Sequence, residues 1–274
     1  MAVSARFGRD VQACHAQIER IVAVARERGA ALVVLPECAL GGYLYEPHVA
    51  GAPAPCAAPP ALARDGGEIA RVAQIAGDVV VCIGYTEAAP GGPYSSAVCV
   101  SGDGILGHHR KVHLPLGERR AFNPGDGFAA FDTPLGRIGM LVCYDKTFPE
   151  AARQLALDGA GLIASLSAWP VCRVDPATWM RRDLQVRHFN LLDQARALEN
   201  QVVWVSSNQV GRFGRLRFPG QAKVVDPRGR VLARTGTRPG VALARVDAPS
   251  VVAAARDRLS YLDDRRPLAY AGVA

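Results

Sequence analysis

Short apolar runs alternate along the chain with segments in which apolar residues recur at helical spacing. The first helical segment precedes Gly29 and repeats apolar side chains at Ile18, Ile21, Val22 and Ala25. Continuous apolar runs follow at residues 31–35, 79–84, 138–142, 162–166 and 202–206. Runs of this length without alternation predict strands that are buried on both faces.

The segments between these runs predict the remaining elements. Helices are predicted at 67–76, 151–157 and 176–200, and a proline-rich surface loop at 51–65. Further strands are predicted at 94–100, 105–111, 222–226, 230–234 and 241–246, followed by a short helix and a polar tail. This alternation, with a few adjacent strand pairs, predicts an α/β fold in which helices cover mixed sheets. We expect residues 1–274 to form a single domain, with the tail from about residue 255 available for a contact between subunits.

Composition narrows the class of protein. At 274 residues with 49% hydrophobic content, the chain can bury a large core. It has no apolar run near the roughly 18 residues that a membrane span requires. Its N-terminus lacks the long apolar region of a secretory signal, so we expect a cytoplasmic protein. The seven cysteines include no CxxC pair, which predicts free thiols instead of a disulfide framework.

The formal net charge of +7 raises the question of nucleic acid binding. The arginines are dispersed, however, and the sequence contains no RNA- or DNA-binding motif. A solvated, arginine-rich surface is therefore the favoured interpretation. We expect small molecules as partners, with no nucleic acid and no membrane.

Cys143 ends the apolar run 138–142 and comes shortly before Pro149 and Glu150, which open a predicted helix. In that position the thiol is expected to be exposed at the end of the sheet, with its thiolate favoured by the helix dipole. A small hydrophobic residue at a strand end fits the same pattern. The segment alone leaves both interpretations open.

Two more predicted strands end next to ionisable residues. Glu37 follows an early strand, and Lys111 ends a later one, with Glu118 in the loop beyond it. Each of these residues by itself is most simply a solvated side chain. Together with Cys143, they place a carboxylate, an ammonium and a thiol at the ends of separate strands.

His109 and His113 are four residues apart and raise the question of a metal site. On a strand, this spacing does not make the two imidazoles neighbours as it would on a helix. No cysteine or acid accompanies them at ligand spacing, so we expect no metal.

Several motifs in order along the chain resemble the nitrilase superfamily of carbon-nitrogen hydrolases. They are Leu35-Pro-Glu37, His109-Arg-Lys-Val-His-Leu-Pro115, Leu141-Val-Cys-Tyr-Asp145 with Phe148-Pro-Glu150, and Arg196-Ala-Leu-Glu-Asn-Gln201. The resemblance extends over nearly the full length and implies an αββα sandwich of two mixed β-sheets flanked by helices. It also implies a homodimer or higher homo-oligomer that pairs through a helical face, and no cofactor or metal. The last motif is expected to buttress the sheet or the active-site loops.

The same resemblance implies roles for the ionisable residues. Cys143 is expected to be the nucleophile and Glu37 the base that takes its proton. Lys111 is expected to supply positive charge beside the oxyanion, with help from the backbone N–H of Tyr144. Glu118 resembles the family's second glutamate, which orients the lysine and contacts the scissile nitrogen.

Three residues are predicted to bind substrate. They are Tyr144, Trp169 on the loop after the strand 162–166, and Lys146, which occupies a position where some relatives place an arginine that holds a substrate carboxylate. Ordinary core packing is the alternative for Trp169, and simple solvation is the alternative for Lys146.

One departure from the family lies at the start of the chain. Only residues 2–5 supply a first strand that in relatives is usually roughly eight residues long. A stunted strand would expose the hydrogen-bonding edge of its neighbour. We therefore expect either a short first strand or a start site upstream.

The pair Tyr144-Asp145 looks more like the amidase and carbamoylase branches than like true nitrilases, in which Trp-Glu is common. We therefore expect an enzyme that cleaves a non-peptide C–N bond of a small linear amide or N-carbamoyl amine through a cysteine thioester, with release of ammonia or an amine. A nitrilase acting on a small nitrile is the alternative. A catalytically silent module that binds a partner is the alternative of another class, against which the intact trio argues. An acyltransferase is a third.

Overall fold

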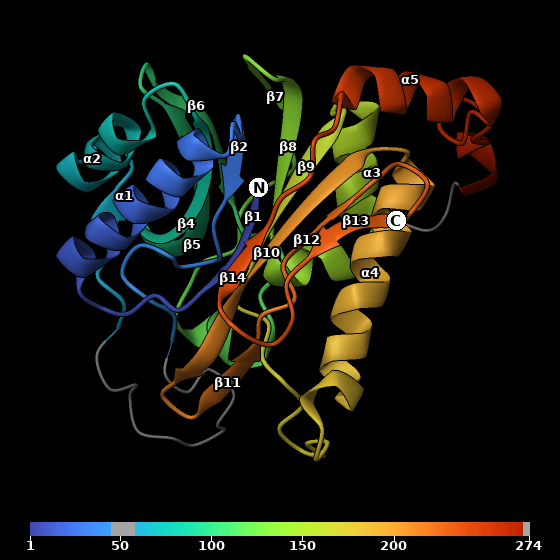
Figure 1. The fold of residues 1–274 in the computed structure, drawn as a ribbon. Helices are drawn as coiled ribbons and strands as arrows, with labels where there is room; N and C mark the ends of the chain where they lie inside the picture. Colours follow the sequence, from blue (N-terminus) through green and yellow to red (C-terminus); the bar gives the residue numbers. More distant parts are fainter. Residues whose placement is uncertain (45–57, 271–274) are drawn as a thin grey trace.

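Two β layers lie between two helical layers (Figure 1). The computed structural model describes residues 1–44 and 58–270, so residues 51–57 of the predicted loop 51–65 lie outside the described residues. The helices are α1 (Val11–Glu27), α2 (Gly67–Ala76), α3 (Pro149–Leu157), α4 (Leu184–Asn200) and α5 (Ala248–Arg258). The 3₁₀ turns are η1 (Leu116–Arg120), η2 (Cys143–Thr147), η3 (Met180–Arg182) and η4 (Pro267–Tyr270).

The strands follow the order β6-β5-β4-β2-β1-β10-β9-β8-β7 across a 14-stranded sheet, and the remaining strands pair at its margins. In chain order they are β1 (Ala2–Ala5), β2 (Leu32–Val34), β3 (Leu62–Ala63), β4 (Val80–Ala89), β5 (Gly92–Ser101), β6 (Gly104–Arg110), β7 (Phe131–Thr133), β8 (Gly136–Val142), β9 (Leu162–Ser167), β10 (Val203–Phe213), β11 (Leu216–Pro219), β12 (Lys223–Val225), β13 (Val231–Arg234) and β14 (Gly240–Ala242).

The first strand joins the two β layers. β1 pairs in parallel with β2, where Ala2 lies opposite Val34, and with β10, where Ser4 lies opposite Asn208. β14 pairs with the same strand in the antiparallel sense. The short first strand expected from the sequence is therefore present, and through it the two β layers of the predicted αββα sandwich form one continuous hydrogen-bonded sheet.

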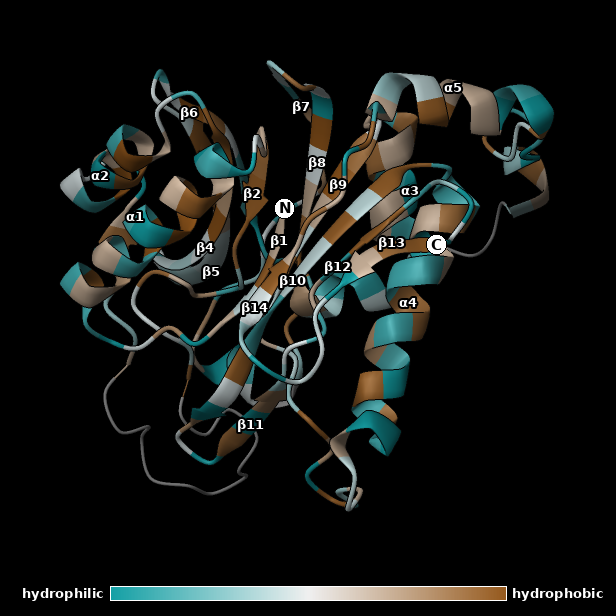
Figure 2. Ribbon diagram, in the orientation of Figure 1, coloured by the Kyte–Doolittle hydropathy of each residue, from teal (hydrophilic) through white to brown (hydrophobic). Residues whose placement is uncertain are grey.

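Hydrophobic clusters fill the space between successive layers. Ile18 of α1 and Ile69 of α2 pack on one β layer, Cys82 and Met140 lie between the β layers, and Leu155 of α3 packs on the other β layer. Burying one such aliphatic side chain contributes roughly 1.5–3 kcal/mol. Figure 2 shows the corresponding pattern, with hydrophobic colour along the strands and hydrophilic colour on the outer faces of the helices. The clusters confirm the predicted αββα architecture.

Helix α4 begins at Leu184, not near residue 176 as predicted. The carboxylate of Asp183 caps it by accepting a hydrogen bond from the backbone N–H of Gln185 at 2.9 Å. The same carboxylate accepts the N–H of Cys172 at 3.0 Å. Because this cap fixes the start of the helix, the residues before it are free to form an irregular loop that closes one side of a cavity described below.

The sequence pattern also missed three short strands, β3, β7 and β11. β3 lies in the predicted loop 51–65 and pairs with β4. β10 continues past the predicted end at residue 206 and forms a hairpin with β11. The apolar pattern is interrupted there by Arg212, Arg215 and Arg217, because only alternate residues of this hairpin are buried.

No helix within residues 1–44 and 58–270 has the length and apolar character that crossing a bilayer requires.

Candidate active site

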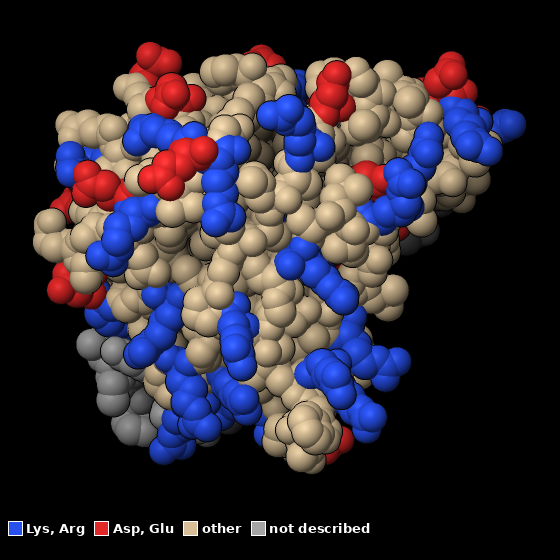
Figure 3. All heavy atoms as spheres, in the orientation of Figure 1, with Lys and Arg blue, Asp and Glu red and all other residues tan. Residues whose placement is uncertain are grey.

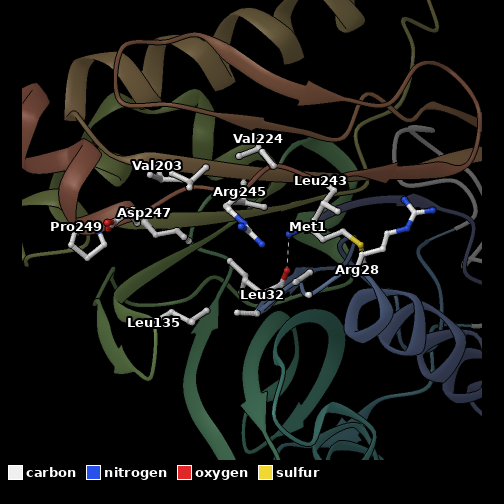
Figure 4. Close-up of a pocket in the computed structure, with 18 residues that line it drawn as sticks. Met1, Arg28, Leu32, Leu135, Val203, Val224, Leu243, Arg245, Asp247 and Pro249 are labelled. Atoms are coloured by element: carbon white, nitrogen blue, oxygen red, sulfur yellow. Dashed lines mark hydrogen bonds between the residues drawn. The ribbon is translucent and has the colours of Figure 1, made fainter.

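The cavities of the protein differ in their chemistry. A cleft of about 580 Å³ is lined by aliphatic residues of β2, β9, β10 and β12 together with the segments 28–31 and 243–249 (Figure 4). There the Met1 amine donates to the Leu32 carbonyl at 2.6 Å, and burial lowers the pKa of the amine to about 6. None of the predicted catalytic residues lines this cleft. A separate cavity of about 680 Å³ contains both Cys143 and Glu118 in its wall, and the candidate site is built around it.

The predicted trio of Glu37, Lys111 and Cys143 lies at the ends of three strands. Glu37 follows β2, Lys111 follows β6, and Cys143 follows β8. The strands β2 and β6 belong to one β layer and β8 to the other, so the site straddles the sandwich. The backbone of Glu37 lies against Gly84 of β4, where a Cβ atom would approach the Glu37 Cα to 2.7 Å. Only glycine leaves room for Glu37 in this position.

Lys111 connects two carboxylates. Its Nζ donates to Glu37 Oε1 at 2.8 Å and to Glu118 Oε1 at 2.8 Å, and all three side chains are fully buried. Glu37 also accepts the Ser95 hydroxyl at 3.2 Å and, on its other oxygen, the backbone N–H of Ala168 at 2.8 Å. A carboxylate with three donors is held in one orientation, which suits a group that must transfer protons at a fixed place.

The second glutamate lies on turn η1 and is shared between two donors. Besides Lys111, the hydroxyl of Tyr43 donates to Glu118 Oε1. Burial raises the pKa of Glu118 to about 7, with Lys111 opposing the rise and Glu37 adding to it. Burial lowers the pKa of Lys111, but the charges of Glu118 and Glu37 outweigh this and hold it well above its usual value. Lys111 therefore keeps its charge at neutral pH.

Cys143 is buried at 6% exposure, and its backbone adopts a left-handed conformation with φ of 49°. Burial, and next the charge of Glu37, raise the pKa of its thiol well above the usual value, while Lys111 lowers it. The prediction of an exposed thiol whose thiolate is favoured by a helix was therefore wrong. Helix α3 begins only at Pro149, so turn η2 separates the sulfur from the helix N-terminus.

Asp145 holds the turn that carries the cysteine, and the sequence did not single it out. Its carboxylate accepts the N–H of Val142 at 3.1 Å and contacts His109 Nε2 and His113 Nδ1, each at 3.0 Å. Burial alone would raise the pKa of Asp145, but the two histidines lower it to about 2. Asp145 is therefore an anion that ties the start of η2 to the segment following β6.

The two histidines are neighbours, contrary to the expectation from their spacing. His113 lies beyond the end of β6, where the chain has turned, so both rings reach Asp145 and both stack on Phe128. Within residues 1–44 and 58–270 the structure contains no cluster of three or more side chains of the metal-binding kinds.

Lys146 does not line the cavity, so its predicted contact with substrate was wrong. Its side chain is fully buried, and Nζ donates to Asp193 Oδ1 of α4 at 2.8 Å. Asp193 also binds Lys223 of β12 and accepts Trp204 Nε1 at 3.0 Å. Phe189 lies beneath both ammonium groups, 3.2 Å from Lys146 Nζ and 4.1 Å from Lys223 Nζ to the ring centroid. The turn η2 directs this lysine into the protein, behind the cysteine.

Arg196, from the last sequence motif, supports the same turn. Its guanidinium donates from Nε to the carbonyl of Lys146 and from Nη2 to the carbonyl of Thr147, each at 2.9 Å. It also pairs with Glu199 at 2.7 Å. These contacts agree with the predicted structural role of the motif.

Tyr144 and Trp169, both predicted to bind substrate, line the cavity with Cys143. The indole N–H of Trp169 donates to Gln185 Oε1 at 2.9 Å, which fixes the ring against α4. Sequence reasoning missed other lining residues, namely Tyr43, Cys172 and Arg173 on loops, Arg119 on turn η1 and Gln185 in the first turn of α4.

Comparison with known proteins bears on this geometry. Residues 5–256 match the family described as carbon-nitrogen hydrolase. The chain is 33% identical over 245 residues to a protein of Pyrococcus abyssi named nitrilase, covering 85% of this chain and 83% of the relative. It is 30% identical over 281 residues to the N-carbamoylputrescine amidase of Solanum lycopersicum, covering 95% and 89%.

A solved structure has the same fold. It is a mutant of the amidase from Nesterenkonia sp. AN1, at a TM-score of 0.73 and 26% identity, covering 98% of this chain and 93% of that chain. It is described as showing covalent addition of the acetamide moiety of fluoroacetamide at the active site cysteine.

The family match spans the strand ends that carry Glu37, Lys111 and Cys143. The chain belongs to the carbon-nitrogen hydrolase family, within the nitrilase superfamily.

Proposed function

We propose that this protein hydrolyses a non-peptide C–N bond of a small linear amide or N-carbamoyl amine through a thioester on Cys143. The observation that carries the proposal is a buried group in which Lys111 donates hydrogen bonds to both Glu37 and Glu118, and in which Glu118 lines the same cavity as Cys143. The charges of all three act on the pKa of the Cys143 thiol. Amidases and a nitrilase among the relatives, and the modified cysteine of the Nesterenkonia amidase, support the same chemistry.

In the first step, Glu37 takes the proton of Cys143 while the sulfur attacks the carbonyl carbon. A C–S bond forms and the carbonyl oxygen becomes an oxyanion. The charge of Lys111 and the backbone N–H of Tyr144 stabilise that oxyanion. Since burial holds the free thiol protonated, proton transfer and attack occur together when substrate is bound, not from a preformed thiolate.

In the second step, the C–N bond breaks. The proton held by Glu37 passes to the leaving nitrogen, so ammonia or an amine departs and a thioester remains on Cys143. Water then enters, loses a proton to Glu37 and attacks the thioester carbon. The C–S bond breaks, the acid is released, and the thiol recovers its proton.

Glu118 has a different role in this scheme. It contacts Lys111 and Tyr43, and its pKa of about 7 leaves it partly protonated at neutral pH. We propose that Glu118 orients Lys111 and contacts the scissile nitrogen, since it also lines the cavity. The scheme needs no metal and no cofactor.

Ammonia and acid release from a panel of amides, N-carbamoyl amines and nitriles tests the proposal. We expect turnover of an amide or carbamoyl compound by the wild type and none by Cys143→Ala. Turnover of nitriles alone would favour the nitrilase alternative. Release that persists in Cys143→Ala would exclude the mechanism, and a well-folded wild type inactive on all three classes would favour a silent binding module.

We also propose that the protein is a homodimer or higher homo-oligomer that pairs through the α3/α4 layer. Leu184, Leu191 and Leu198 of α4 are 48%, 64% and 43% exposed and lie seven residues apart, so they form one apolar stripe. In the tail, Leu268 and Tyr270 are also exposed.

Sedimentation tests this assembly. We expect a wild-type oligomer that dissociates on Leu191→Lys, while the matched change Leu232→Lys, on the exposed side of β13, leaves it intact. A monomeric wild type at high concentration would contradict the proposal.

A further inference from the structure

The charged residues in the described wall of the cavity are Glu118, Arg119 and Arg173. Glu118 is committed to Lys111 and Tyr43. The guanidiniums of Arg119 and Arg173 lie on exposed residues of the same wall, and the wall contains no further described acid to balance them. The interior of the site is therefore internally paired, and its mouth is positive.

A second group of arginines lies on the hairpin β10–β11. Arg212 and Arg217 are directly opposite one another in register, and both are exposed. Like charges placed opposite one another across two strands are destabilising. The hairpin is held on its buried side by Phe213, Leu216 and Phe218, which pack in one hydrophobic cluster.

This hairpin is attached directly to the cavity. Its buried side packs in one cluster with Tyr43 and Ala168, which both line the cavity. The backbone N–H of Val171, another lining residue, donates to the carbonyl of Arg217 at 2.9 Å. The backbone of the hairpin that carries these arginines is thus joined to the wall of the cavity by a shared hydrophobic cluster and a hydrogen bond.

The surface shows the same separation of charge. In Figure 3, Lys and Arg side chains gather over the hairpin β10–β11 at the lower end of the visible face, whereas most Asp and Glu side chains lie toward the upper end. Basic side chains that gather on one part of the surface raise the local concentration of anions there.

We propose that the substrate carries a carboxylate at the end remote from the scissile bond, that Arg119 and Arg173 bind this carboxylate at the mouth of the cavity, and that the arginines of hairpin β10–β11 attract it. This inference rests on the proposed hydrolysis at Cys143. It selects, within small amides and N-carbamoyl amines, the compounds that end in a negative charge over those that end in an ammonium. The residues that bind the carboxylate differ from Lys146, which is sealed behind the cysteine.

Matched substrates test the proposal. The probes are straight-chain amides of equal length that end in a carboxylate, a methyl group or an ammonium, and N-carbamoyl compounds with the same three ends. We expect kcat/KM to be about tenfold higher for the carboxylate than for the methyl end, and lowest for the ammonium. The preference should shrink severalfold between roughly 0.05 and 0.5 M salt, because salt screens charges at the surface.

Substitutions of Arg119 and Arg173 test whether these residues cause the preference for a carboxylate end. Arg119→Gln and Arg173→Gln should each reduce the ratio of kcat/KM for the carboxylate over the methyl substrate by roughly threefold to fivefold, and Arg119→Lys should restore part of it. A merely structural defect would lower kcat/KM for both substrates by the same factor and leave the ratio unchanged. Arg20→Gln, on exposed α1 away from the cavity wall, is the matched control and should change neither rate.

The outcomes separate this inference from the proposed function. Turnover that depends on Cys143 but is equal for the three ends, or highest for the ammonium, would overturn the inference and leave the hydrolase intact. Loss of all turnover in every wild-type assay would overturn both.

Discussion

Within residues 1–44 and 58–270, two of the buried charge clusters have opposite compositions. Glu37, Lys111 and Glu118 combine two carboxylates with one ammonium beside the cavity. Lys146, Asp193 and Lys223 combine two ammonium groups with one carboxylate, sealed between Phe189 and the sheet. The ratio of carboxylates to ammonium groups in each cluster determines which of its groups has a pKa close to neutral.

In the first cluster the excess charge is negative; the pKa of Glu118 is raised to about 7, and that of Lys111 is held well above its usual value. In the second it is positive, and burial lowers the pKa of Lys223 to about 8, with Asp193 opposing the change. Only the first cluster meets the cavity through Glu118. Both clusters are buried and charged. Access to a substrate is therefore what distinguishes the catalytic cluster from the supporting one.

The largest expected difference between the clusters is in activity. Lys111→Met removes the ammonium beside the oxyanion and should lower kcat/KM by about 10²–10³-fold. Lys223→Met also removes a buried ammonium, but leaves Lys146 paired with Asp193, and should retain most of the activity. Steady-state kinetics on the best amide substrate measures both. Equal losses in the two variants would remove the functional distinction between the clusters.

Stability should respond in the opposite way. Asp193→Asn leaves two buried ammonium groups without their shared carboxylate, and should lower the free energy of unfolding by about 3–5 kcal/mol. Glu118→Gln leaves Lys111 paired with Glu37 and should lower it by only about 1 kcal/mol. Urea denaturation at pH 7 compares them. A reversed ranking would mean that the sealed cluster is not the supporting one.

The two clusters should also give opposite pH dependences of stability. The folded pKa of Glu118, about 7, lies above its ordinary value of 4.5, so this group lowers the free energy of unfolding as pH rises from 4.5 to 7. The folded pKa of Lys223, about 8, lies below its ordinary 10.5, so this group raises the free energy of unfolding as pH rises from 8 to 10.5.

The difference in the free energy of unfolding between wild type and variant isolates the contribution of each group. The stability of wild type relative to Glu118→Gln should fall across the acidic window, and that of wild type relative to Lys223→Met should rise across the alkaline one. Flat difference curves in both windows would show that these groups titrate normally in the folded protein.

The smallest expected effect concerns the link between the clusters. Arg196 holds the carbonyls of Lys146 and Thr147 and so supports the turn that carries Cys143. Arg196→Lys keeps the charge but loses the two-pronged geometry. We expect kcat to fall by roughly threefold to tenfold with little change in KM, since the nucleophile is displaced but the cavity wall is not. A change confined to KM would place Arg196 in substrate binding instead.

The sequence predicted the first cluster much better than the second. Glu37 and Cys143 each follow a clear apolar run, Lys111 ends a predicted strand, and strand ends of an α/β fold gather at an edge where sites form. Lys146 was misplaced because its direction depends on how η2 packs against α4, which no local pattern records. Asp193 and Lys223 lie on separate elements, and only the tertiary fold brings them together.

The boundaries of elements show the same limit. The apolar pattern located most strands, yet α4 begins at a cap set by Asp183, and β11 was missed because its exposed face carries arginines. Local periodicity reports burial along one segment. The identity of the cavity wall depends on loops that have no periodicity, including those of Arg119 and Arg173.

The most direct measurement is the mass of the intact protein, quenched during turnover of its best amide, followed by peptide mapping. The account predicts an added acyl group on Cys143 that disappears as substrate is exhausted and never forms in Cys143→Ala. An acyl group on another residue, or steady turnover by Cys143→Ala, would contradict it.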